Sequence, residues 1–334
     1  MRALHLLYLF GTWLPLALAI PCFAVSCKTQ AAIPNAERTA IAQAAREIAL
    51  HVQSGRIAEL KAATAPEVAA NFGGIAQSVS ALQPLIAGAT ITVDSVYRLD
   101  ASDAQAGEPQ QQFFCDTADN STQTTFTIDH LPAGQFAFAL IHATGVARPQ
   151  QIALLLQEQQ PSAPWLLAGF FPKPLTMAAH DGVWYWKQAR VYAAKKQAWN
   201  TWFYNAAAIS LLQPAGFMTT THLDKLFEEQ QASRPPELPS ARTPLIIHAG
   251  DASYQITSLH TDDALGGYDL VVHYDSTGND PVSNREHTLA VMQGLLALRP
   301  ELREAFHGVW VFADAGAGGQ GFSLELTMEE IPRS

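Results

Sequence analysis

Three histidine–aspartate pairs are the first residues of this chain whose types and spacing could do chemistry. They share the pattern His-x-Asp and are His222-Leu-Asp224, His260-Thr-Asp262 and His273-Tyr-Asp275. Residues two apart on a strand point to the same face, so His273 and Asp275 could reach one metal ion, and imidazole with carboxylate suits zinc or iron. The other reading is a solvated turn, because a chain with eleven histidines makes such pairs by chance. We therefore expect no cofactor and keep His273 with Asp275 as an alternative metal pair.

A second candidate site is an apolar face of predicted strands that also carries tyrosine and histidine. Alternation in GQFAFALIHAT places Phe136, Phe138 and His142 on one face. If that face points toward the N-terminal helices, Tyr97, Phe136, Phe138 and His142 line a ligand pocket together with His130. In the enzyme alternative the catalytic residues are His142, His130 and Tyr97. A histidine there could act as a general acid or base. The other reading leaves His130 in water at a strand end and His142 bonded to a backbone carbonyl.

The start of the chain has the pattern of an export signal. Arg2 is the only charged residue before Lys28, and the run from 4 to 25 is almost wholly apolar. A basic start, an apolar segment and small residues at its end are typical of a secretory signal peptide. We predict a signal peptide at residues 1–26 and an exported protein. An uncleaved membrane anchor is the alternative, because about twenty apolar residues can also span a bilayer.

The residues that close this run, Ala24-Val25-Ser26-Cys27, resemble the lipobox of bacterial lipoproteins, except that Ala24 stands where leucine is usual. The resemblance implies lipidation of Cys27 and a cell-envelope location, with the membrane as a partner reached through the lipid anchor. Periplasmic or secreted protein without lipid is the alternative. A disulfide between Cys27 and Cys115 is also open, and it requires that Cys27 carries no lipid.

Composition excludes some classes of function. The 334 residues carry a formal net charge of −10, and 48% of them are hydrophobic. No block of lysine or arginine is present beyond Lys195-Lys196, so we expect no nucleic acid as a partner, because binding phosphates needs a basic surface. The glycine-rich stretch Gly316–Gly321 is followed by a strand pattern instead of a helix, so we interpret it as a hairpin loop and not as a phosphate site.

Hydrophobic spacing predicts helices followed by strands in the first half of the chain. Residues 38–65 carry apolar side chains at intervals of three and four, and 66–85 continue as a second helical segment. From residue 88 the period changes to two, and strand patterns continue to residue 172. An antiparallel sheet curved over the N-terminal helices is the economical solution.

This element order, with the closing hairpin IALLLQEQQPSAPWLLAGFF, resembles the cone-shaped α+β fold of the cystatin-like and nuclear-transport-factor-2-like superfamily. The resemblance covers residues 36–174. It implies a fold that holds ligands between sheet and helices and that serves both enzymes and non-enzymatic envelope domains. It carries no catalytic motif at the level of single residues.

The second half is predicted to contain a helical hairpin and a small α+β domain. Residues 181–214 resemble a single tetratricopeptide-type hairpin, rich in aromatic residues that either bind a partner or cement the hairpin to the cone-shaped domain. A proline-rich linker at 232–243 leads to a ββαββ domain at 244–332. Several histidines crowd this last domain: His248, His260, His273, His287 and His307.

The expected organisation is therefore an α+β chain of several parts. They are a signal peptide (1–26), a linker (27–35), the cone-shaped domain (36–174), the helical hairpin (175–231), a linker (232–243) and the C-terminal domain (244–332). We expect a non-catalytic binding or assembly module of the bacterial envelope, with an envelope protein or a small apolar ligand as partner. The alternative is an isomerase- or hydrolase-like enzyme that uses the pocket of the cone-shaped domain.

Overall fold

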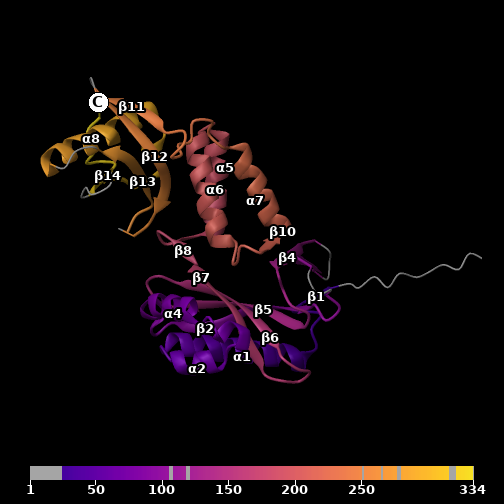
Figure 1. Ribbon diagram of the computed structural model, residues 1–334. Coiled ribbons are helices and arrows are strands. Elements are labelled where there is room, and N and C mark those ends of the chain that lie inside the picture. The colour runs from indigo at the N-terminus through magenta and orange to yellow at the C-terminus, as the bar shows by residue number, and fades with distance from the viewer. Residues whose placement is uncertain are drawn as a thin grey trace, which may run out of the picture.

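The computed structural model describes residues 25–104, 108–117, 121–249, 252–264, 266–276, 280–315 and 321–333. The predicted signal peptide lies outside these residues except for its last two positions, and so does most of the glycine-rich stretch. Among the described helices, none combines the length and the apolar character that crossing a bilayer requires. The fold is mixed α+β with several sheets, as predicted (Figure 1).

The N-terminal part is a five-stranded sheet with helices on one face. The strands are β1 (Ser26–Thr29), β2 (Thr90–Asp100), β5 (Gln135–Thr144), β6 (Gln150–Glu158) and β7 (Trp165–Pro174). They are antiparallel neighbours in the order β1-β2-β5-β6-β7. The helices are α1 (Asn35–Gln53), α2 (Ile57–Ala62), α3 (Pro66–Ala69) and α4 (Gly73–Ile86).

Helix α1 packs on this sheet through the apolar stripe that its spacing predicts. Ile41, Ile48 and Val52 are buried and lie in one core cluster with the alanines of β5. Ala137 and Ala139 are among those alanines, and their short side chains let the helix approach the sheet closely. The phenylalanines of β5 point to the opposite face, whereas Ile141 lies on the helix side with the alanines.

A second, three-stranded sheet covers that opposite face. Its strands are β3 (Gln110–Asp116), β4 (Gln123–Asp129) and β10 (Met218–Thr220), in the order β10-β4-β3. Phe136 and Phe138 are buried between the two sheets together with Phe113 and Phe126. The prediction that these β5 side chains face the N-terminal helices is therefore wrong, because the alanines of β5 face the helices instead.

Three helices follow the N-terminal sheet and lie between it and the C-terminal sheet in Figure 1. They are α5 (Gly182–Ala194), α6 (Ala198–Leu212) and α7 (Thr221–Ala232), preceded by the short pair β8 (Thr176–Met177) and β9 (His180–Asp181). Asp181 begins α5 by accepting a hydrogen bond from the Trp184 amide at 2.7 Å. Gly182 is required there, since a Cβ would lie 2.5 Å from Leu212 of α6.

The C-terminal part is a mixed sheet backed by helices. Its elements are β11 (Leu245–Ala249), β12 (Ala252–Asp262), β13 (Asp269–Ser276), α8 (Pro281–Leu298), α9 (Leu302–Ala305), β14 (Gly308–Ala315) and β15 (Phe322–Thr327). The strand order follows the chain, and only β13 and β14, which the helices connect, are parallel. Three strands precede α8, so the predicted ββαββ order lacks one strand.

The aromatic helices share their core with the C-terminal sheet. Tyr185 and Tyr204 belong to one buried cluster with Tyr268 and Phe306, and the Tyr268 hydroxyl donates a hydrogen bond to the Phe203 carbonyl at 3.0 Å. The expectation that these rings bind the helices to the cone-shaped domain is therefore wrong for this cluster. Rings from α5 and α6 meet the strands and loops that come more than sixty residues later.

Candidate functional site

The face predicted to line a ligand pocket is a packed core. Phe138 lies 5.0 Å from Phe126, centroid to centroid, and Phe126 lies 5.2 Å from Tyr97. Phe136 and Phe138 are at most 1% exposed. The rings of the second sheet therefore pack directly against the face that was expected to line a ligand pocket.

The histidines predicted beside that pocket do not converge with Tyr97. His142 lies opposite Thr92 in the β2–β5 ladder, whereas Tyr97 lies opposite Phe138. The two rows are four residues apart along β5, or roughly 13 Å at the rise of a strand. His130 is exposed beyond the end of β4, where its amide donates to the Pro109 carbonyl at 2.9 Å. His130 therefore lies in water at a strand end, as its alternative interpretation states.

His142 has a carboxylate nearby instead of a catalytic partner. Its Nδ1 lies 3.8 Å from the Asp94 Oδ1, too far for a hydrogen bond, and both side chains are partly exposed. Among the described residues, no hydrogen bond from the His142 ring to a backbone carbonyl is found, so the alternative reading of this ring is not met either. An exposed pair of this kind contributes little to stability.

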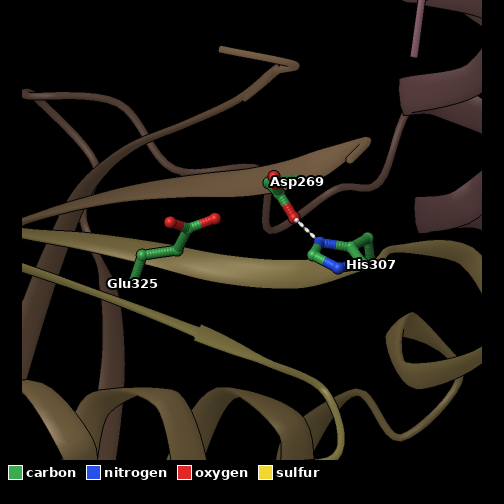
Figure 2. A group of neighbouring side chains, drawn as sticks. All are labelled: Asp269, His307 and Glu325. Atoms are coloured by element: carbon green, nitrogen blue, oxygen red, sulfur yellow. Dashed lines mark hydrogen bonds and ion pairs between the residues drawn. The ribbon is translucent and has the colours of Figure 1, made fainter. Parts of the chain in front are cut away.

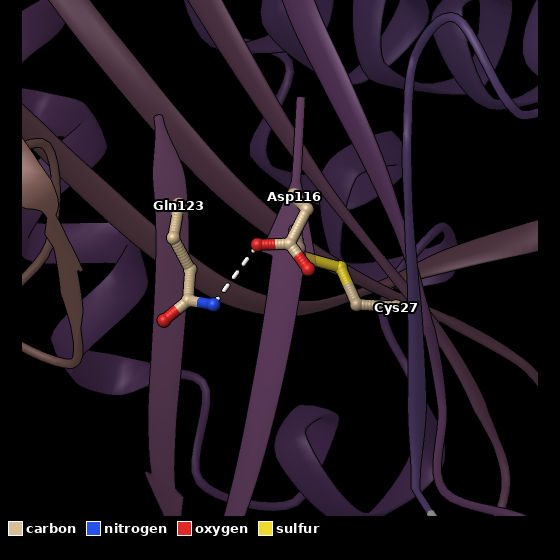
Figure 3. Close-up of a disulfide and its surroundings, with 4 residues drawn as sticks. Cys27, Asp116 and Gln123 are labelled. Atoms are coloured by element: carbon tan, nitrogen blue, oxygen red, sulfur yellow. Dashed lines mark hydrogen bonds between the residues drawn. A yellow bond between two sulfur atoms is a disulfide. The ribbon is translucent and has the colours of Figure 1, made fainter. Parts of the chain in front are cut away.

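The two cysteines of the described chain form a disulfide (Figure 3). Cys27 on β1 is joined to Cys115 on β3, with 5.1 Å between their Cα atoms. A hydrogen bond of 2.9 Å from Gln123 to Asp116 closes the β3–β4 ladder beside it. A sulfur that is bonded to another sulfur has no thiolate to carry a lipid, so the predicted lipidation of Cys27 is incompatible with this structure. The structure agrees instead with the alternative prediction, a disulfide between Cys27 and Cys115.

The predicted metal pair is not assembled as expected. The Nδ1 of His273 lies 3.0 Å from the Asp314 Oδ2 of the neighbouring strand, so Asp314, and not Asp275, supplies its carboxylate. The His273 ring stacks on Phe312 with 4.8 Å between centroids. The neighbouring His260 has a pKa lowered by burial and by the closeness of His273. The His273 ring is therefore packed on the surface of the sheet.

A different group of side chains in the same sheet has the geometry of a metal centre (Figure 2). Asp269 at the start of β13, His307 directly before β14 and Glu325 on β15 each offer one donor atom, and these atoms all lie within 4.8 Å of one another. The His307 Nδ1 lies 3.0 Å from the Asp269 Oδ1. Asp269 is only 2% exposed, and a carboxylate this buried is normally paired; His307 is the partner it has among the described residues.

Two glycines make room for this group. A Cβ on Gly267 would lie 2.3 Å from the His307 ring, and a Cβ on Gly308 would lie 2.6 Å from the Leu326 carbonyl oxygen and 3.0 Å from Asp269. No side chain can occupy either position without moving the histidine or the strands. The parallel β13–β14 ladder, which pairs Leu270 with Val309, brings the starts of both strands to one end of the sheet.

The charges of the group favour a cation. The pKa of Glu325 is raised by burial and by the negative charge of Asp269, while His307 opposes the shift. Two carboxylates held this close repel each other, and a cation placed between them removes the repulsion. Imidazole and carboxylate together suit a zinc-like divalent ion better than calcium or magnesium, which prefer oxygen ligands alone.

Sequence reasoning missed this group because its members are spread over 57 positions and follow no short motif. His307 stood only among the crowded histidines of the last domain, and Asp269 and Glu325 were not considered. The glycines beside the aspartate and the histidine, in GGYDL and HGVW, are the one signal that could have pointed to it.

Searches of protein-family models, curated proteins and solved structures find no match for this chain. Function therefore has to be inferred from the geometry.

Proposed function

We propose that this chain is an exported bacterial envelope protein that serves as a non-catalytic binding module and holds a divalent cation at Asp269, His307 and Glu325. The observation that carries the proposal is the set of three donor atoms within 4.8 Å of one another, one of them on a buried aspartate. Zinc-type ions bond nitrogen and oxygen ligands at about 2.0–2.2 Å. Ligand atoms on one such ion are about 3–4 Å apart, so small side-chain rotations complete the site.

The three ligands leave one position of a tetrahedral ion open. Structural zinc sites use four protein ligands, whereas three leave the fourth for water or an incoming group. His307 is half exposed, at 50% of its side chain, so that position is reached from solvent. An open position on an exposed ion suits a module that recruits a partner carrying a carboxylate or an imidazole.

Export is supported by the disulfide and by the apolar start of the chain. Disulfides persist in oxidising compartments and are rare in the cytosol, and Cys27–Cys115 ties two sheets together. The protein we propose therefore carries no lipid on Cys27. A net charge of −10 supports the expectation that nucleic acid is not a partner.

The enzyme alternative loses its main support. It depends on a pocket between Tyr97, Phe136, Phe138 and His142, and the phenylalanine rings fill that space.

Isothermal titration with zinc chloride tests the proposal. We expect one tight equivalent in the native chain and a loss of tenfold or more in affinity for His307→Ala and for Glu325→Gln. His248→Ala is the matched control, because His248 lies in the same sheet and contacts only the Ser253 hydroxyl, at 2.9 Å, among the groups described for it. Zinc affinity unchanged by His307→Ala, with the control also unchanged, would refute the site.

A further inference from the structure

A pocket of about 420 Å³ opens between α5, α6 and α7. Its volume falls in the range of about 300–1,000 Å³ that small-molecule sites occupy. Small residues at the helix contacts create it: Ala189, Ala193, Ala198 and Ala232. The polar residues that line it are Arg190, Lys196, Gln197, Thr201, Asn205, Glu229 and Ser233. None of them belongs to the proposed cation site.

Asn205 is the feature that points to a ligand. It is 1% exposed and lines the pocket, yet within the described structure neither its Oδ1 nor its Nδ2 has a hydrogen-bond partner. A buried amide without partners is costly and uncommon in native proteins. Its neighbour Asn200, on the same helix, is half satisfied: its Nδ2 donates to the Glu301 carbonyl at 2.8 Å, and only its Oδ1 has no partner among the described residues.

The chemistry of an asparagine amide restricts what can satisfy it. One atom donates and the other accepts, so the complementary group must offer an acceptor and a donor side by side. A carboxylate only accepts and would leave Oδ1 unpaired. One peptide amide cannot do this, because its N–H and C=O point in opposite directions. The N–H and C=O of one residue in an extended peptide point to the same side and satisfy both atoms.

The opposite end of the pocket favours an anion. Gln197 and Ala198 at the start of α6 line it, no side chain caps that helix end, and a helix N-terminus attracts negative charge. Lys196 lies beside it, and no ion pair or hydrogen bond of its ammonium is found among the described residues. An anion at this end would meet both the helix dipole and a free positive charge.

The charged pair at the rim is already satisfied. Arg190 donates two hydrogen bonds to Glu229, at 3.0 and 2.8 Å, and its guanidinium lies over the Trp186 ring at 4.3 Å. Trp186 donates to the same carboxylate at 2.7 Å. These side chains are therefore already paired with one another, and the groups left to recognise a ligand are Lys196, the start of α6 and Asn205.

We propose that this pocket binds a short extended peptide with a free C-terminal carboxylate. The carboxylate lies at Lys196 and the α6 N-terminus, and the N–H and C=O of one residue pair with Asn205. From Ala198 to Asn205 the helix rises roughly 10 Å at 1.5 Å per residue. Three extended residues span a similar length, at about 3.3–3.6 Å each. The proposal is independent of the cation site, and either can fail without the other.

Titration calorimetry of the full chain with N-acetyl-trialanine tests it, with the same peptide as its C-terminal amide and with octanoate as comparison probes. We expect the carboxylate peptide to bind, the C-terminal amide to bind at least tenfold more weakly, and octanoate, which has no amide, to bind weakly. Asn205→Leu should lower the affinity for the carboxylate peptide at least tenfold. Lys196→Met should do the same, and Lys187→Met, on an exposed part of α5, should not.

The thermal midpoint without peptide separates a lost ligand contact from a lost fold. Asn205→Leu should leave the thermal midpoint unchanged or raise it, because the amide that is removed has no partner. Asn200→Leu should lower the midpoint, because it removes a hydrogen bond to Glu301. No heat with N-acetyl-trialanine at millimolar concentration would overturn the proposal. Equal affinity in native chain and folded Asn205→Leu would overturn it as well.

Discussion

Removing the Cys27–Cys115 disulfide should destabilise the N-terminal sheets strongly. The bond closes a loop of 88 residues, and the chain-entropy relation gives about 4–5 kcal/mol for a loop of that length. The thermal midpoint of a domain of this size changes by about 2–4 °C for each kcal/mol of stability, so it should fall by about 10–15 °C. The bond also fastens the edge strand β1, which is paired only to β2 in its sheet.

The design is a double-mutant cycle with Cys27→Ala, Cys115→Ala and both together. Each single variant breaks the same bond, so all three should lose about the same free energy of unfolding in urea, and the double variant should lose no more. A reducing agent should lower the midpoint of the native chain and leave the variants unchanged.

Two results would refute the reasoning. Intact mass under non-reducing conditions could show two free thiols, or a lipid mass on a peptide that begins at Cys27. Alternatively, the reducing agent could leave the native midpoint unchanged. Additive losses in the double variant would mean that each cysteine acts through its own packing and not through a shared bond.

Three further changes test other parts of the structure. Gly308→Ala places a methyl group 2.6 Å from the Leu326 carbonyl. The free energy of unfolding in urea should therefore fall by about 1–3 kcal/mol, and zinc should bind more weakly. Unchanged stability would contradict the tight packing at this position. In the same assay Phe138→Ala should lower the free energy of unfolding by about 3–5 kcal/mol. A loss below 1 kcal/mol would mean that the space around Phe138 is an open pocket. The pKa of Glu229 is lowered from 4.5 although burial raises it, because hydrogen bonds from Arg190 and Trp186 outweigh burial, so Glu229→Gln should change the stability profile in acid.

The sign of that last effect follows from the direction of the shift. The folded pKa of Glu229 lies below its unfolded value, so the ion pair contributes fully above about pH 4.5, and its contribution is lost as the pH falls through the folded pKa. Glu229→Gln should therefore flatten the acid side of the stability curve measured by thermal melts. Glu228→Gln, one residue away, is the control and should leave the curve unchanged.

The sequence by itself determined the local structure. The spacing of Ile41, Ile48 and Val52 predicted α1 and its buried side, and alternation predicted β5 with two distinct faces. These features depend on contacts between residues close in the chain, whose period sets which side chains share a face. The α+β class follows from them and is confirmed.

Only the tertiary structure decided which partner each face meets. Alternation along β5 separates Ala137 from Phe138, but it does not say that the alanines take the helices and the phenylalanine takes a second sheet. The same holds for Asp269 and His307, which a parallel ladder brings together across 38 positions. Contacts between distant segments depend on shape and volume in the assembled core, which no local pattern records.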